Sequence, residues 1–149
     1  MKIAIGSDHA GYKLKSIISG YLLESSHVIV DTGTDSTNSC DYPDFAARTA
    51  RLVSIGEVDR GILICGTGIG MAITANKFKG VRATLCSNTE EAKLSRQHNH
   101  ANIICLGSRS RSKEENLSIL QVWLDTPVEG GRHRNRVKKI ISLEQDNFK

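Results

Sequence analysis

A cysteine at the end of an apolar run, followed by a glycine-rich loop, is the feature of this sequence with the clearest chemical use. In GILICGTGIGMAI, residues 61–73, the β-favouring run ends at Cys65, and three of the next five residues are glycine. Because glycine has no Cβ, the backbone N–H groups of 66–70 are open to a bound oxyanion. A helix beginning after the loop would direct its positive end at the same place. A thiolate in such a cradle is a competent proton acceptor or nucleophile.

The residues after Cys65 do not match the common cofactor loops. A dinucleotide fingerprint counted from Gly66 needs glycine where Met71 stands, and the G-K-[ST] of a Walker loop is absent. Met71 also occupies the position of the arginine of a cysteine phosphatase loop. Most free cysteines are small buried core residues. We expect that role for Cys86 and Cys105, which no glycine cradle follows, whereas the loop favours a chemical role for Cys65.

Length and composition favour one intracellular domain. The chain has 149 residues, the size of one domain with a substantial core, so we expect a single domain over 1–149. It contains no run of about 18 apolar residues. In MKIAIGSDHA a charged residue follows too soon to leave room for the apolar region of a signal peptide. The four cysteines form no C-x-x-C pair, which argues against a disulfide framework or a structural metal site. We expect a cytoplasmic protein with no membrane contact and no metal.

A basic segment near the end of the chain, GGRHRNRVKK at residues 130–139, holds much of the net charge of +4. Such a cluster is typical of nucleic-acid binding. However, the segment contains no Phe, Tyr or Trp, so the stacking platform of a single-strand binder is missing. The pattern favours a compact anion such as a phosphate group, and we expect no nucleic-acid partner.

Apolar runs and amphipathic stretches alternate along the chain. Short runs rich in Ile and Val, typical of buried parallel strands, lie at 2–5, 28–30, 61–65, 82–86 and 102–106. Stretches with helical periodicity lie at 12–24, 45–53, 69–77, 90–97, 113–124 and 135–145. This alternation predicts a doubly wound, Rossmann-like α/β fold: a three-layer α/β/α arrangement with a five-stranded parallel sheet and a C-terminal helix.

Polar and glycine residues follow four of the five predicted strands. The segments GSDHAG, CGTGIG, CSNT and GSRSR leave the first, third, fourth and fifth strands. In a doubly wound sheet, ligands bind beyond the carboxyl ends of the strands, where the winding reverses. The longest irregular stretch, residues 31–43, is long enough for a lid or a site role. The sequence therefore predicts a ligand site at one edge of the sheet.

Five ordered motifs resemble those of one enzyme family. GSDHAG, DYPDFA, GILICGTGIGMAITANK, LSRQHN and EGGRHRNR are similar to motifs of the type B ribose 5-phosphate isomerases, a group that also includes allose 6-phosphate and galactose 6-phosphate isomerases. The resemblance covers nearly the whole chain. It implies interconversion of ribose 5-phosphate and ribulose 5-phosphate through an enediolate, with no metal or organic cofactor.

The resemblance also implies roles for the cysteine loop and the LSRQHN motif. Cys65 would abstract the proton next to the carbonyl, and Thr67 would add a hydroxyl. His98 would open the furanose ring as acid and base, and Asn99 would bind a sugar hydroxyl. The enediolate oxygen would be held by the backbone N–H groups of Gly66, Thr67, Gly68, Ile69 and Gly70.

The remaining substrate contacts implied by the resemblance are polar or basic. Asp8 and His9 would bind the substrate, while Arg109, Arg132 and Arg136 would face its phosphate. The spacing of the last two puts them on one helix face if the helix begins near 132. Alternatives stay open for some of these residues, because Asp8 could instead cap the first helix.

Several other polar residues could have ordinary surface roles instead of a role in the site. His9 and His98 could be ordinary surface histidines, and we expect that role for His100. Arg134 would project away from the chosen arginines as a solvated charge.

The basic segment follows the last predicted strand and its helix, so it has no obvious route back to Cys65. If each subunit of a two-fold dimer placed this segment in the site of the other, two identical sites would be completed at once. We therefore expect a homodimer, or a dimer of dimers, in which Arg132 and Arg136 serve a site whose cysteine belongs to the other subunit. The sequence also carries the cysteine loop, RQHN and GGRHRNR together, which favours one kind of subunit.

Short motifs do not encode which sugar phosphate fits the cavity. Allose 6-phosphate and galactose 6-phosphate are alternatives to ribose 5-phosphate at this stage. The alternative to an enzyme is a non-catalytic module that binds sugar phosphates or nucleic acid.

Overall fold

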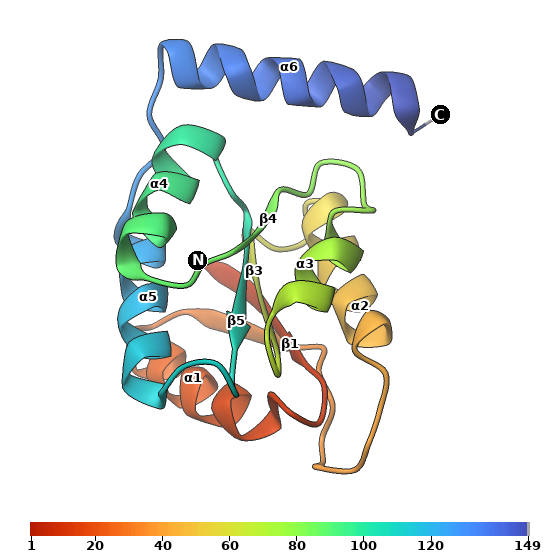
Figure 1. The fold of residues 1–149 in the computed structure, drawn as a ribbon, viewed down its shortest axis with the longest axis vertical. Coiled ribbons are helices and arrows are strands. Elements are labelled where there is room, and N and C mark those ends of the chain that lie inside the picture. Colours follow the sequence, from red (N-terminus) through yellow and green to blue (C-terminus); the bar gives the residue numbers. More distant parts are fainter. Residues whose placement is uncertain (149) are drawn as a thin grey trace.

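A five-stranded parallel sheet forms the centre of the molecule (Figure 1). The computed structural model describes residues 1–148. The strands are β1 (Lys2–Ser7), β2 (Val28–Asp31), β3 (Arg60–Cys65), β4 (Ala83–Leu85) and β5 (Ile103–Gly107). Their order in the sheet is β2-β1-β3-β5-β4, and all four pairings are parallel. The winding therefore reverses between β1 and β3.

Helices cover both faces of the sheet, which confirms the doubly wound three-layer fold predicted from the sequence. They are α1 (Tyr12–Glu24), α2 (Tyr42–Ser54), α3 (Ile69–Ala75), α4 (Thr89–Asn99), α5 (Lys113–Asp125) and α6 (Arg132–Asn147). One hydrophobic cluster joins α1, α4 and α5 to one face of the sheet, and a second joins α2 and α3 to the other.

Strand periodicity decides which core each side chain enters. Successive residues of a strand point to opposite faces of the sheet. On β3, Ile62 and Ile64 pack into the cluster of α1, α4 and α5, while Leu63 and Cys65 pack into the cluster of α2 and α3. Full burial of an Ile or Leu side chain is worth about 1.5–3 kcal/mol, so a shift of register by one residue would be costly. The same alternation directs Cys65 toward α2 and α3.

Two helices begin earlier than the sequence periodicity predicts. Helix α2 begins at Tyr42 rather than near residue 45, with Pro43 in its first turn, where a missing N–H costs nothing. Helix α6 begins at Arg132 rather than near 135, after Gly131 with a φ of 59°. The second difference places Arg132 and Arg136 one turn apart on the same helix.

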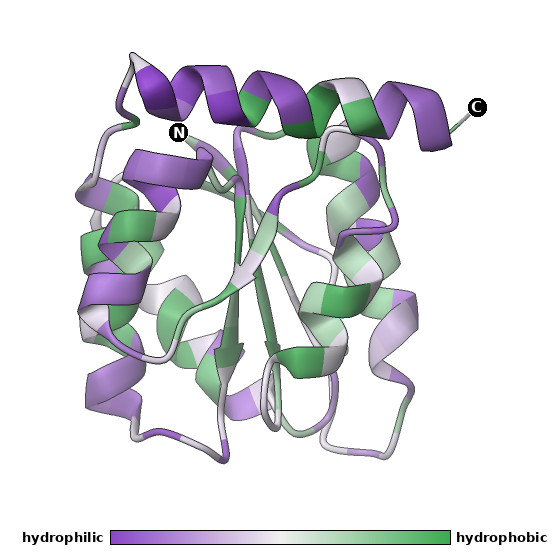
Figure 2. Cartoon of the chain, turned by 45° about the horizontal axis from the view of Figure 1, so that its top comes forward, coloured by the Kyte–Doolittle hydropathy of each residue, from purple (hydrophilic) through white to green (hydrophobic). Residues whose placement is uncertain are grey.

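Helix α6 lies across the end of the molecule opposite the carboxyl ends of β1, β3 and β5 (Figure 1). It packs mainly against α4, and only His133 and Val137 of its residues are buried. Most of its surface is hydrophilic, with a hydrophobic band in its second half (Figure 2). Within residues 1–148, no helix has the length and apolar character needed to cross a membrane.

Candidate active site

A cavity of about 440 Å³ lies at the carboxyl ends of β1, β3 and β5. Its walls come from the segments that follow these strands and from α2 and α3. The lining includes eight of the residues singled out from the sequence: Asp8, His9, Cys65, Gly66, Thr67, Ile69, Gly70 and Arg109. This is the place where the winding of the sheet reverses, as the rule for doubly wound folds requires.

The Cys65 sulfur is held by its own loop. The Gly68 N–H donates to Cys65 Sγ at 3.1 Å, and the thiol is buried, with 5% of the residue exposed. The Ile69 N–H donates to Thr67 Oγ1 at 3.2 Å. Two of the five amides expected to bind an oxyanion are thus used inside the loop.

Three amides of the same loop are open. Within the described chain, the N–H groups of Gly66, Thr67 and Gly70 donate to no protein acceptor. Each of these residues lines the cavity. An oxyanion in the cavity would therefore meet N–H donors beside the thiol, because the loop leaves them without an internal partner.

Gly68 and Gly70 are required by close approaches, and Gly68 also by its left-handed conformation. Gly68 has a φ of +81°, and a Cβ there would lie 3.1 Å from the backbone of Leu106. A Cβ on Gly70 would lie 2.5 Å from the ring of Tyr42. The loop therefore fits between β5 and the start of α2 only because these positions lack side chains.

Asp8 and His9 both line the cavity, and each has a structural contact as well. Asp8 Oδ1 accepts the Gly11 N–H at 3.1 Å, so the carboxylate supports the entry to α1 as well as facing the site. His9 Nδ1 accepts the Cys40 N–H at 3.2 Å. An accepting Nδ1 leaves the proton of the neutral imidazole on Nε2, so Nε2 is the donor available to a ligand.

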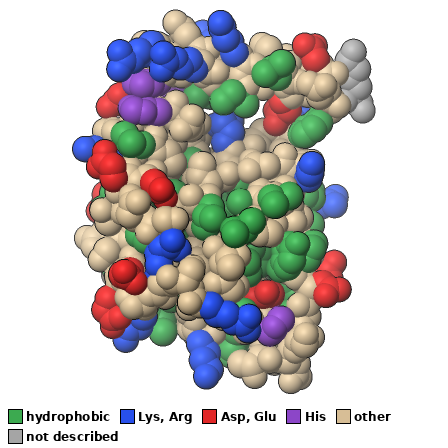
Figure 3. All heavy atoms as spheres, in the orientation of Figure 1, with side chains coloured by type: hydrophobic (Ala, Val, Ile, Leu, Met, Phe, Trp, Pro, Cys, Tyr) green, Lys and Arg blue, Asp and Glu red, His purple; other side chains and the backbone are tan. Residues whose placement is uncertain are grey.

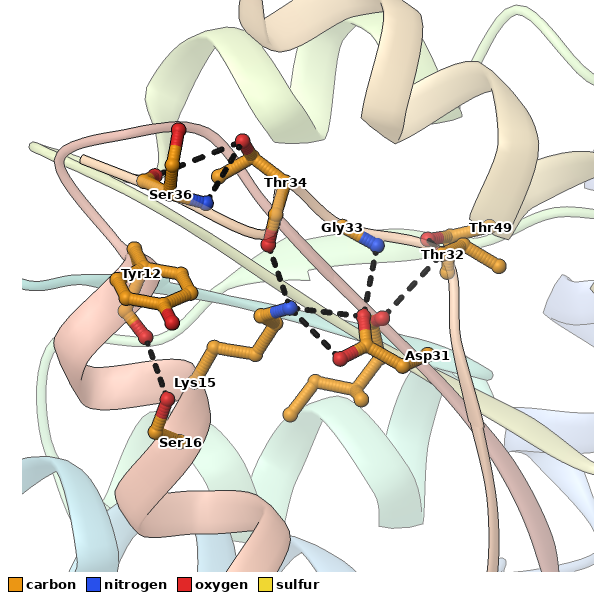
Figure 4. A network of polar contacts seen from close by, with 10 residues as sticks. Tyr12, Lys15, Ser16, Asp31, Thr32, Gly33, Thr34, Ser36 and Thr49 are labelled. Atoms are coloured by element: carbon orange, nitrogen blue, oxygen red, sulfur yellow. Dashed lines mark hydrogen bonds and ion pairs between the residues drawn. The ribbon is translucent and has the colours of Figure 1, made fainter. Parts of the chain in front are cut away.

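An ion pair between the buried Lys15 and the half-exposed Asp31 anchors the loop that carries Cys40. Lys15 Nζ lies 2.7 Å from Asp31 Oδ2 and donates to the Thr34 carbonyl at 2.7 Å (Figure 4). Asp31 Oδ1 also accepts the Gly33 N–H at 2.9 Å. These bonds fix the first residues of the segment between β2 and α2. The segment then brings the Cys40 N–H to His9, so Lys15 acts on the site through the loop.

Arg109 supplies positive charge at the cavity. It is exposed, and its side-chain carbons pack beside Gly66. Its guanidinium forms no ion pair within residues 1–148. A guanidinium with unused donors at a cavity wall suits a phosphate group, which it binds through two parallel hydrogen bonds.

Four of the predicted site residues lie elsewhere. His98 and Asn99 end α4, while Arg132 and Arg136 lie in the first turns of α6. None of the four lines the cavity. These helix segments lie at the opposite end of the sheet (Figure 1), and Figure 3 shows histidine side chains with Lys or Arg nearby at both ends of the molecule. The residues predicted from the sequence therefore fall into two groups, here called half-sites, which the fold of one subunit keeps apart.

The second half-site is organised around a stacked pair of imidazoles. The rings of His98 and His133 lie 4.0 Å apart at an interplanar angle of 5°. Arg96, two residues before His98, donates to the carbonyls of Ala101 and Thr126 and so fixes the end of α4. The stack holds the ring plane of His98 beside the arginines of α6.

The surroundings of His133 favour the neutral form of its imidazole. Burial lowers the pKa of His133, and the charges of His98 and Arg132 lower it further, against the opposing charge of Glu129. Glu129 Oε2 lies 3.4 Å from His133 Nε2.

Within residues 1–148, His98, Glu129 and His133 form the one group with the composition of a metal site, with ligand atoms within 4.8 Å of one another. An imidazole nitrogen binds a metal in the plane of its ring. Because the two rings lie in parallel planes, one of them would have to turn before both could bind the same ion. The geometry fits a stacked pair better than a metal site.

The other polar residues considered in the sequence have structural contacts. Cys86 and Cys105 are buried in the two cores, and burial raises the pKa of both thiols. His100 Nε2 lies 2.8 Å from the Glu129 carbonyl oxygen, and Arg134 is exposed. None of the four lines the cavity around Cys65.

Sequence reasoning missed three contributors to the two half-sites. Tyr42 lines the cavity, and its position in the quoted motif DYPDFA is the one sequence feature that could have indicated it. His133 lies between the chosen arginines, where helical spacing argued for outward residues. Lys15 gave no signal, because its partner Asp31 is sixteen residues away and their contact depends on the packing of α1 against β2.

Comparisons with known proteins agree with this geometry. The family model described as Ribose/Galactose Isomerase matches residues 3–140. The chain is 49% identical over 144 residues to ribose-5-phosphate isomerase B of Escherichia coli, with 97% of each chain covered. A solved structure of ribose-5-phosphate isomerase B from Clostridium thermocellum is 48% identical with a TM-score of 0.96, covering 98% of this chain and 99% of that one. The enzyme from Mycoplasma genitalium, solved with bound ribulose-5-phosphate, is 44% identical with a TM-score of 0.94, covering 98% and 97%. The resemblance inferred from the motifs is confirmed.

The loop geometry predicts unequal effects for two glycine substitutions. Gly80 has a φ of +78° with open space around it, whereas Gly68 has a φ of +81° with the Leu106 backbone at 3.1 Å from a built Cβ. Gly80→Ala is expected to lower the free energy of unfolding by roughly 1–2 kcal/mol, the cost of a left-handed alanine. Gly68→Ala should lower it by at least ~1 kcal/mol more, because the neighbouring backbone must shift. Urea denaturation measures both, and equal losses would contradict the described packing of the loop.

Proposed function

The chain belongs to the ribose/galactose isomerase family, and on that basis we propose that it interconverts ribose 5-phosphate and ribulose 5-phosphate with Cys65 as the base. One observation supports the role of Cys65 most directly. Its sulfur accepts the Gly68 N–H at 3.1 Å in a cavity that also presents Arg109. A proton acceptor, amide donors and a phosphate-binding cation are thus within one site.

The chemistry is a proton transfer between adjacent carbons. The Cys65 thiolate takes the proton from the carbon next to the carbonyl, and the resulting thiol returns it to the neighbouring carbon. An N–H donor at the sulfur stabilises negative charge there. The enediolate oxygen is held by the open amides of Gly66, Thr67 and Gly70. A single donor of this kind is worth roughly 2.7–4 kcal/mol of transition-state stabilisation.

Other side chains of the cavity bind the open-chain sugar. The Nε2–H of His9 and the free oxygen of Asp8 face hydroxyl groups, and Thr67 adds a hydroxyl. Arg109 binds the phosphate. In this proposal none of these steps uses a metal or an organic cofactor.

The reaction also needs ring opening and a full phosphate site, which one subunit does not assemble. His98, Asn99, Arg132 and Arg136 are at the amino ends of the strands, and the six residues of β3 alone span roughly 20 Å. A two-fold dimer with antiparallel subunits brings this end of one subunit to the Cys65 cavity of the other. We infer a homodimer, or a dimer of such dimers, with both sites at the subunit interface.

Exposed apolar side chains support this assembly. On α6, Ile140 is 44% exposed and Leu143 is 62% exposed. Beside the Cys65 cavity, Ile69 and Ile73 of α3 are 52% and 60% exposed. Contiguous apolar patches of this kind mark interaction surfaces. Packing α6 of one subunit near α3 of the other would bury both patches and carry Arg132 and Arg136 to the cavity.

The sequence left alternative functions open. The relatives compared above are named for ribose 5-phosphate, and one holds ribulose 5-phosphate. We therefore favour the pentose phosphate over allose 6-phosphate and galactose 6-phosphate. The family membership also supports an enzyme over a non-catalytic binding module. A cytoplasmic location stays a prediction.

Replacing the base should reduce turnover without abolishing binding. Cys65→Ser is expected to lower kcat by about 10²–10⁴-fold, the usual contribution of a general base, with a much smaller change in KM. The rate of ribulose 5-phosphate formation measures both parameters. Cys40→Ser is the matched control and should retain activity, because Cys40 does not line the cavity, its backbone N–H bond to His9 is kept, and a serine hydroxyl can replace the Sγ contact with His9 Nδ1. Near-normal turnover of Cys65→Ser would remove this thiol from the mechanism.

Mixing inactive variants tests the shared site. If Cys65 and Arg136 of one site come from different subunits, then Cys65→Ala mixed with Arg136→Ala forms heterodimers with one intact site. Activity should return to about half of normal per heterodimer, because two-fold closure gives each dimer two sites. Cys65→Ala mixed with His98→Asn should recover activity in the same way.

A third mixture controls for non-specific recovery. His98 and Arg136 belong to the same half-site, so His98→Asn mixed with Arg136→Ala should form no intact site and regain nothing. Differently tagged subunits verify exchange in every mixture. Demonstrated exchange without recovery in the first two mixtures would show that each subunit completes its own site.

A further inference from the structure

A second cavity of about 260 Å³ lies beside the active-site cavity, between α1, the segment after β5 and the start of α5. Arg109 and Ala10 line both cavities. The second cavity is therefore next to the proposed catalytic site and shares its cationic wall, although it contains neither Cys65 nor the glycine loop.

Four cationic residues line this second cavity: Lys13, Arg109, Arg111 and Lys113. They come from α1, from the segment after β5 and from the first residue of α5. No aspartate or glutamate is among its lining residues. Cationic side chains that converge from three segments on a cavity wall without a carboxylate create a positive potential there that favours a compact anion.

The nearest carboxylates of α5 are engaged elsewhere. Glu115 accepts the Ser112 N–H at 2.7 Å in a capping box, and it lines a different cavity with Ser87 and Ile119. Glu114 lies 3.6 Å from Lys113 Nζ, with both side chains more than half exposed. An exposed pair of this kind is weak, so Lys113 is available to an anionic ligand.

The segment that carries the two arginines is fixed before any ligand arrives. Asn116 is fully buried, and its Nδ2 donates to the carbonyls of Gly107, Arg111 and Ser112. Arg111 Nε donates to the Ser87 carbonyl at 2.6 Å, which orients the guanidinium and leaves further N–H groups unused. A preorganised guanidinium loses little entropy on binding a phosphate group.

We propose that this cavity binds the phosphoryl group of a second small molecule, either inorganic phosphate or a phosphomonoester, and that this ligand draws Arg109 away from the substrate. The inhibitory part rests on the proposed function, because it assigns Arg109 to the substrate phosphate. Occupancy of the second cavity then raises the KM for ribose 5-phosphate and leaves kcat unchanged.

Calorimetric titration with inorganic phosphate at low ionic strength tests the site. The wild-type protein is expected to bind two phosphates per subunit, one in each cavity. Lys13→Gln/Lys113→Gln should weaken the second by roughly 2- to 30-fold, the range for two exposed ion pairs. Lys77→Gln/Lys93→Gln is the matched control, because both lysines are exposed and lie outside the cavity. Arg111→Lys provides a second test with the charge retained, and it should weaken binding through loss of the fixed guanidinium.

Kinetics connect the second cavity to the active site. In the wild-type protein, the KM for ribose 5-phosphate should rise with phosphate concentration more steeply than the straight line that one competing ion gives. In Lys13→Gln/Lys113→Gln the rise should follow that straight line. A parallel titration with glycerol 3-phosphate tells an ester from the free ion as the preferred ligand. A single phosphate per wild-type subunit, or unchanged binding in both cavity variants, would overturn the proposal. Two bound phosphates on a protein without isomerase activity would instead overturn the proposed function and leave the binding site standing.

Discussion

The common direction of the five strands is the constraint on which the rest of the structure depends. In a parallel sheet all carboxyl ends meet at one edge, so the segments after β1, β3 and β5 gather around Cys65. Each connecting helix must then return to the amino edge. A residue that ends such a helix, as His98 does in α4, is therefore held a full strand length from the thiol.

This separation would give the proposed dimer a chemical role, because it would unite the two ends of the subunit. One end of the subunit holds a thiol, open amides and Arg109, while the other holds a stacked imidazole pair and the arginines of α6. In the proposed mechanism, either end alone would carry out only part of the reaction, because the base and the ring-opening residue lie at different ends. The antiparallel pairing proposed here unites the halves twice, and it buries the apolar residues of α3 and α6 that the single chain leaves exposed.

Patterns local in sequence predicted most of the fold and many of the residues that line the Cys65 cavity. The apolar runs gave all five strands, and the glycines after Cys65 indicated the amide cradle because a loop that approaches other backbone so closely excludes side chains. Contacts between distant segments left no such pattern. The Lys15–Asp31 anchor depends on how α1 packs against β2, and the internal use of the Gly68 amide depends on the turn itself. The separation of His98 from Cys65 follows from strand direction, which the alternation of strands and helices already implied.

A crystal structure of the wild-type protein with ribulose 5-phosphate bound tests the shared site most directly. We predict that one sugar phosphate contacts Cys65 and Arg109 of one subunit together with His98, Arg132 and Arg136 of the other. The same structure would show whether α6 crosses the interface. A ligand bound at Cys65 with all its protein contacts from a single subunit would contradict the account.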